Sequence, residues 1–136
     1  DAPVAEVDAA FAAVLRKIEE ARRHSGASEG DEAKAIVALL RTAVDDYQGG
    51  VKDGKIADLH EYQDAWGFVE VARARASQMA GEGDKPEKAF GEKTLAALDE
   101  ARVALPDVSP KGKPLGDASI FLGAAASVEL AAYKLR

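Results

Sequence analysis

The chain has 136 residues, and its 18 Lys and Arg against 24 Asp and Glu give a formal net charge of −6. This length suits one domain with its own core, and the acidic balance argues against general nucleic-acid binding, which requires clustered Lys and Arg. The sequence contains no Cys, which excludes disulfides, thiolate metal sites and a Cys nucleophile.

No stretch of the sequence is suited to span a membrane. The longest uncharged stretch near the C-terminus, 118–128, is bounded by Asp117 and Glu129 and is shorter than the about 20 apolar residues that a bilayer requires. The N-terminal residues also lack the basic start and apolar run of a signal peptide. We expect a single helical-bundle domain over 1–136. Because the last residues still fit a helix, one interpretation is that this domain is a fragment of a longer membrane-linked protein.

The first two predicted helices follow from apolar residues at helical spacing. The first has its apolar stripe at Val4, Val7, Phe11, Val14, Leu15 and Ile18. It is expected to end near Gly26, because Gly favours the left-handed position after a helix. The second begins near Asp31 and stops at Gly49–Gly50. Its stripe is Ile36, Val37, Leu40, Val44 and Tyr47.

Turn and cap residues delimit the remaining helices. The stretch 51–57 is predicted as a turn centred on Asp53–Gly54. Asp58 then opens a third helix, in a capping box with Glu61. The apolar stripe of this helix is Leu59, Tyr62, Trp66, Val69, Ala72, Ala76 and Met79.

The C-terminal part of the chain predicts two more helices. Pro86 suits the first turn of a fourth helix, and Asp117 caps the last one. The segment 106–116 between them holds three prolines and two glycines and is predicted as a loop. No segment has the period-two, β-branched pattern of strands. The fold class is therefore all-α, an up-and-down antiparallel bundle of four to five helices.

Catalysis has little support in the sequence. The only histidines are His24, at a predicted helix end, and His60. The sequence contains no Gly-rich phosphate loop and no His-Glu-x-x-His zinc motif. We therefore predict that the chain is not an enzyme.

Acidic residues gather in the middle of the sequence. Asp45 and Asp46 end the second helix, and His60, Glu61 and Asp64 lie in the first two turns of the third. If the two helices are an antiparallel pair, these five side chains meet at one end of the bundle. A His with several carboxylates suits iron, zinc or manganese. These five residues are the predicted metal ligands, although the Glu-x-x-His motif of di-iron bundles is absent.

A second interpretation needs no ligand. Asp58 and Glu61 already act as a helix cap, and acidic residues in a first helical turn are favoured by the helix dipole. Tyr47, Tyr62, Trp66 and Phe68 are expected in the core or at its edge. Arg73 and Arg75 are expected on solvated faces.

One segment resembles a known family. Residues 46–56, Asp-Tyr-Gln-Gly-Gly-Val-Lys-Asp-Gly-Lys-Ile, are followed by Glu-Tyr-Gln-Asp-Ala at 61–65. This order resembles the extracytoplasmic helical region in front of the membrane domain in some bacterial high-affinity iron permeases. The small-residue stretch 124–132 is similar to the helix that closes the same region. The matching motif positions are Asp46, Tyr47, Asp53, Gly54, Glu61 and Tyr62.

The resemblance implies a periplasmic accessory role in iron acquisition, without catalysis. The permeases' own membrane helices, with their Arg-Glu-x-x-Glu motifs, are absent, so the chain is either an excised domain or a free-standing relative. Two hypotheses follow: a domain that weakly binds iron or docks on a partner, and a purely structural or interaction bundle. The partners expected are a metal ion, the permease membrane domain or another periplasmic protein, and a second copy of the chain.

Overall fold

The computed structural model describes residues 9–10, 12–14, 16–17, 29–112 and 114–135. Its elements from residue 29 onward are α2 (Glu29–Gly50), β1 (Val51–Lys52), β2 (Lys55–Ile56), α3 (Leu59–Glu82), α4 (Lys85–Glu100), η1 (Ala101–Val103) and α5 (Ala118–Tyr133). The residues described between 9 and 17 are helical. The rest of the first predicted helix, including its expected end near Gly26, lies outside the described residues.

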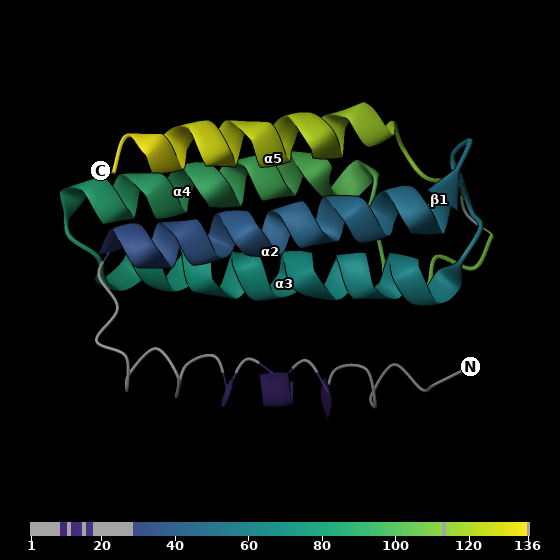
Figure 1. The fold of residues 1–136 in the computed structure, drawn as a ribbon, viewed down its shortest axis with the longest axis horizontal. Coiled ribbons are helices and arrows are strands. Elements are labelled where there is room, and N and C mark those ends of the chain that lie inside the picture. The colour runs from purple at the N-terminus through teal and green to yellow at the C-terminus, as the bar shows by residue number, and fades with distance from the viewer. Residues whose placement is uncertain (1–8, 11, 15, 18–28, 113, 136) are drawn as a thin grey trace.

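The long helices α2, α3, α4 and α5 lie side by side as an up-and-down bundle (Figure 1). Each helix contacts the next along the chain, and α5 returns to contact α2. The two strands form a short hairpin that joins α2 to α3. The predicted all-α fold class is therefore confirmed. The start of α2, the end of α3 and the end of α5 lie at one end of the bundle, opposite the hairpin (Figure 1).

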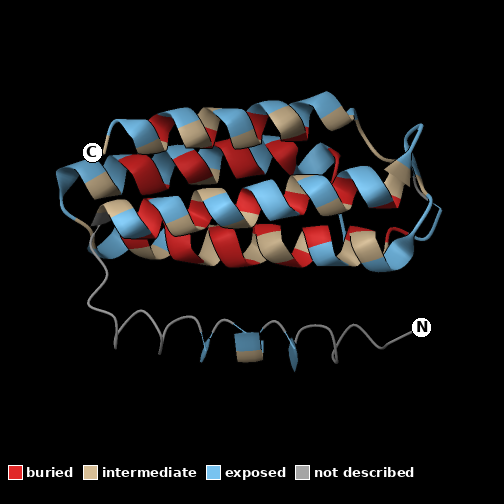
Figure 2. Cartoon of the chain, viewed as in Figure 1, coloured by how far each residue is buried: buried red, intermediate tan, exposed pale blue. Residues whose placement is uncertain are grey.

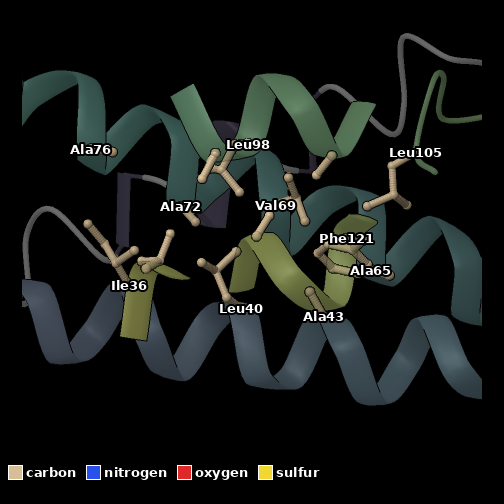
Figure 3. Packing of buried hydrophobic residues seen from close by; sticks show 14 of the residues in the cluster. Ile36, Leu40, Ala43, Ala65, Val69, Ala72, Ala76, Leu98, Leu105 and Phe121 are labelled. Carbon is tan, nitrogen blue, oxygen red and sulfur yellow. The ribbon is translucent and has the colours of Figure 1, made fainter. Parts of the chain in front are cut away.

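The core lies between the helices, whose inward faces are buried (Figure 2). Its largest apolar members with less than 2% exposure are Tyr62, Phe121, Ile36, Leu40, Leu98, Val71 and Val128. Alanines fill the space between the larger residues along α2 and α3, as at Ala43, Ala65, Ala72 and Ala76 (Figure 3). The close approach of α3 and α4 depends on Gly91, because a Cβ there would lie 2.5 Å from the carbonyl oxygen of Ala76.

Side-chain caps start the helices largely as predicted. The Asp58 carboxylate accepts from the Glu61 amide at 3.2 Å, and the Asp117 carboxylate accepts from the Ser119 amide at 2.9 Å. The capping box expected at Asp58 is incomplete, since the Asp58 amide donates to the Gly50 carbonyl oxygen instead. The complete box is formed at the start of α4 by Asp84 and Glu87.

The turn predicted over 51–57 is a two-residue hairpin. Val51 pairs with Ile56 and Lys52 with Lys55. Asp53 and Gly54 at its tip have φ angles of 52° and 73°, and two successive residues with positive φ favour Asp-Gly. The strands were not predicted, because two residues are too few to show a period-two pattern.

One charged pair is buried between α2 and α3. Arg75 is 5% exposed and donates from Nε and Nη2 to the two carboxylate oxygens of Glu32, each at 2.7 Å. Arg73 is half-buried and donates to Asp99 on α4 at 2.6 Å, and this bond lowers the pKa of the Asp99 carboxyl. The prediction that Arg73 and Arg75 lie on solvated faces is therefore wrong: α2 and α4 supply a carboxylate opposite each guanidinium.

Breaking the buried pair is expected to be costly. Replacing Arg75 by Met leaves the Glu32 carboxylate buried without its partner, which typically costs about 3–5 kcal/mol. We expect the free energy of unfolding, measured by urea denaturation, to fall by that amount. Arg41→Met is the control, because it removes an ion pair to Glu129 in which the Arg41 side chain is 65% exposed, and it should cost less than about 1 kcal/mol.

The double variant Glu32→Leu/Arg75→Met removes both charges and fills the space with apolar atoms. It should regain most of the stability lost in Arg75→Met. Equal costs for Arg75→Met and Arg41→Met would contradict the importance assigned to the buried pair.

Candidate functional site at the hairpin end of the bundle

The hairpin brings the predicted metal ligands to one end of the bundle. Asp45 and Asp46 lie near the end of α2, and His60, Glu61 and Asp64 lie in the first turns of α3. Asp45, His60 and Asp64 are exposed, whereas Asp46 and Glu61 are half-buried.

Their carboxylates influence one another. Partial burial raises the pKa of the Asp46 carboxyl, and the negative charges of Asp64, Glu61 and Asp45 raise it further. The Glu61 carboxylate lies in the space where a Cβ would stand at Gly49, so it packs against the end of α2. We call Asp45, Asp46, Glu61 and Asp64 the acidic cluster. It concentrates negative charge where the α2 dipole is also negative.

Proximity does not amount to a coordination sphere. Among the residues that the structure describes, no group of three or more His, Cys, Asp or Glu side chains is placed to hold a metal ion. The five predicted ligands thus share one end of the molecule without converging on one point, and metal binding there stays a prediction.

The tyrosines that follow two of these acids lie in the core. The ring centroids of Tyr47 and Tyr62 are 6.4 Å apart, and Tyr47 meets Phe121 edge to face at 5.3 Å. The Tyr62 hydroxyl donates to the Asp107 carbonyl oxygen at 2.6 Å, and burial raises the pKa of Tyr62. The sequence pairs Asp46–Tyr47 and Glu61–Tyr62 therefore each place an aromatic ring in the core and a carboxylate nearer the surface.

The hairpin is fixed to both sides of the bundle end. The Gly50 carbonyl oxygen accepts from the amides of Ala57 and Asp58 at 2.8 and 3.1 Å. At the tip, the Gly54 carbonyl oxygen accepts from the Leu115 amide of the α4–α5 loop at 3.3 Å. The Asp-Gly turn thus ties two connections that are far apart in the sequence, which gives this end a defined shape.

Two clefts were not predicted from the sequence. One, of about 620 Å³, lies beside the hairpin and is lined by residues that include Tyr47, Gly54 and Asp117. The other, of about 770 Å³, lies between the start of α2 and the end of α5. Both depend on how α5 sits against α2, which no local pattern encodes.

These features define an all-α four-helix bundle with an acidic, hairpin-capped end. In the described part of the chain, no helix is long and apolar enough to cross a membrane.

The chain belongs to the family of the iron permease-associated 4-helix bundle domain, whose model matches residues 20–129. This confirms the resemblance noted from the motif. It associates the chain with iron permeases, and the family is not one of enzymes. No curated protein and no solved structure matches the chain.

The raised pKa of Asp46 predicts a pH-dependent stability difference. Asp46→Asn removes a carboxylate that burial, its neighbours and the helix dipole all disfavour, so at pH 7 it should stabilise the fold by about 0.3–1 kcal/mol. The folded-state pKa lies above the ordinary value of 3.8, so the penalty in the parent is complete above the folded-state pKa. It disappears as the pH falls through that pKa towards 3.8.

The measurement is urea denaturation of both proteins between pH 7 and pH 3.5. The advantage of Asp46→Asn should shrink over the acidic part of that range. Glu92→Gln, which removes an exposed carboxylate from the middle of α4, controls for the change in net charge. An advantage that does not change with pH would contradict the electrostatic account.

Proposed function

We propose that this bundle is an extracytoplasmic, periplasmic accessory domain of an iron-uptake permease, and that it acts by docking on the permease membrane domain rather than by catalysis. The observation that carries the proposal is the family match over 110 residues, which includes nearly all of the four helices. Iron is the cargo of such a system, so the domain needs no resident cofactor to serve it.

The hairpin end supports a docking role. Its turn is held by hydrogen bonds to Gly50 and from Leu115, and a preorganised surface loses little conformational entropy on binding. Lys52, Asp53 and Lys55 are exposed at this tip and offer charges of both signs to a partner. The motif residues Asp53 and Gly54 form the turn itself, so part of the resemblance lies in this hairpin.

Iron uptake tests this proposal directly. Deleting the coding region of this chain from iron-limited cells should lower the initial rate of radioactive iron uptake several-fold. A copy with a secretion leader should restore the rate, whereas the same copy without a leader should not, because the proposed site of action is the periplasm. Unchanged uptake after deletion, or rescue by the leaderless copy, would refute the proposal.

A second candidate function is weak cation binding by the acidic cluster. The observation that favours it is the proximity of like charges: burial raises the Asp46 pKa, and the charges of Asp64, Glu61 and Asp45 raise it further. A bound cation would relieve this repulsion. Asp45, Asp46, His60, Glu61 and Asp64 supply the oxygen and imidazole ligands that iron, zinc and manganese accept. Rotamer changes would have to bring them together, which favours weak rather than tight binding.

Thermal melts distinguish this candidate from docking alone. The metal-stripped protein is melted with ferrous iron under anaerobic conditions, ferric citrate, copper, zinc and manganese. An ion present at 100 times its dissociation constant should add about 2.7 kcal/mol, a shift of several degrees. The double variant Glu61→Ala/Asp64→Ala should lose that shift, and Glu92→Ala/Glu100→Ala on α4 should keep it. No selective shift with any ion would eliminate the metal site and leave docking unaffected.

A further inference from the structure

The cleft of about 620 Å³ beside the hairpin, which we call the hairpin cleft, combines apolar walls with carboxylates. Its half-buried apolar lining residues are Val51, Leu115 and Leu122. Asp53 and Asp117 also line it and are exposed. The hairpin and the start of α5 lie at the same end of the bundle (Figure 1), and a hydrogen bond from the Leu115 amide to the hairpin tip joins them. The cleft is therefore bounded by two segments that are held to each other.

A buried hydroxyl without a hydrogen bond belongs to the lining of this cleft. Tyr47 lines the cleft and is 2% exposed, and its ring packs against Phe121 in the first turn of α5. Among the described residues, none forms a hydrogen bond with the Tyr47 hydroxyl. A buried hydroxyl without a partner is costly, and a ligand that donates a hydrogen bond to it would remove that cost.

The Tyr47 hydroxyl also lies near a carboxylate of the same cleft. Burial raises the pKa of the Tyr47 phenol, and the negative charge of Asp117 raises it further. The Asp117 carboxyl itself is anionic over a wide pH range, because the hydrogen bond from the Ser119 amide at 2.9 Å lowers its pKa. The hydroxyl and a permanent negative charge are thus within electrostatic reach of one ligand.

The charges of the hairpin cleft favour a cationic ligand. Lys52 also lines it, but the Lys52 ammonium donates to the Gln48 carbonyl oxygen of α2 at 2.7 Å. In the described part of the chain, two of the three charged residues that line the cleft are carboxylates. The net charge of the whole chain, −6, has the same sign.

An arginine side chain matches this combination of walls and charges. Its methylene stem packs against apolar surface while its charged end stays among polar groups. The planar guanidinium has five N–H donors and no acceptor, and the two carboxylates and the Tyr47 hydroxyl oxygen are all able to accept from it. A metal ion would use the oxygen ligands but leave the apolar walls uncovered, so the lining favours a side chain with an apolar stem.

We propose that the hairpin cleft binds an arginine side chain of the protein on which the domain docks, with the guanidinium between Asp53, Asp117 and the Tyr47 hydroxyl. The inference rests on the proposed function and deepens it, because it names the part of the hairpin end that the partner contacts. The source of the guanidinium is a segment of the membrane domain that faces the bundle, rather than a free small molecule.

A nuclear magnetic resonance titration of the full chain tests the cleft. The probe is Nα-acetyl-arginine methylamide, and its control is Nα-acetyl-citrulline methylamide, which has nearly the same shape and no charge. At about 0.15 M ionic strength, attraction between exposed charges more than about 8 Å apart is largely screened. The arginine derivative should shift the backbone amides of Gly54, Leu115 and Ala118 saturably, with a Kd of the order of millimolar. The citrulline derivative should bind at least about tenfold more weakly.

Three variants locate the binding. Tyr47→Phe removes only the unpartnered hydroxyl and should weaken binding of the arginine derivative roughly fivefold without lowering the melting temperature. Asp117→Asn removes the charge but keeps a residue that caps a helix equally well, and it should weaken binding roughly tenfold. Asp45→Asn is the matched control, because it removes the same charge from the acidic cluster outside the cleft. It should leave the Kd within about twofold of the parent value.

Equal binding of the two derivatives, or arginine binding that Tyr47→Phe and Asp117→Asn both leave unchanged, would overturn the proposal. Equal weakening by Asp45→Asn and Asp117→Asn would also overturn it, since binding would then follow the diffuse charge of the whole hairpin end. The titration needs no permease, so its result is separate from the uptake test. Absent arginine binding together with lowered uptake after deletion would reject the hairpin cleft and keep the proposed function.

Discussion

The contact between the end of α2 and the start of α3 sets the register of these two helices, on which the core packing and the buried ion pair depend. Gly50 has no room for a side chain, because a Cβ there would lie 2.6 Å from the Tyr62 amide nitrogen. Its carbonyl oxygen accepts from two amides that precede α3. With the two backbones fixed this closely, the register of the antiparallel pair is set. Tyr47 then lies beside Tyr62, and Glu32 reaches Arg75 about four turns further along both helices.

This register explains why a charged pair is tolerated in the core. A buried ion pair recovers its desolvation cost only with good geometry, and here both carboxylate oxygens accept from the guanidinium at 2.7 Å. A slip of one helical turn would leave both charges buried and unpaired. The pair therefore destabilises alternative registers of α2 against α3. A core rich in alanine distinguishes poorly between these registers by itself.

The sequence predicted the features that depend on neighbouring residues. Helical periodicity identified the buried faces, and the caps at Asp58 and Asp117 and the turn at Asp53–Gly54 follow from local hydrogen bonding and positive φ. Sequence patterns did not predict the contacts between segments that are far apart in the chain. Arg75 lies three residues after Ala72 and four before Met79, in phase with the α3 stripe, and Glu32 lies four residues before Ile36. This phase was a signal of burial that the prediction of a solvated face for Arg75 overlooked, and only the packing of the two helices shows that each residue supplies the other's partner.

The acidic cluster illustrates the same limit at the site. The sequence predicted that Asp46, Glu61 and Asp64 lie at one end of the bundle, and the structure places them there, at the end of α2 and the start of α3. Ligand geometry requires side chains to point at one centre, which spacing along two helices does not specify. The Tyr47 and Tyr62 side chains point into the core at this end. Asp46 and Glu61, which precede them in the sequence, therefore point away from the core. The arrangement that builds the hairpin end thus points its carboxylates away from one centre, which favours the proposal of docking over tight chelation of an ion.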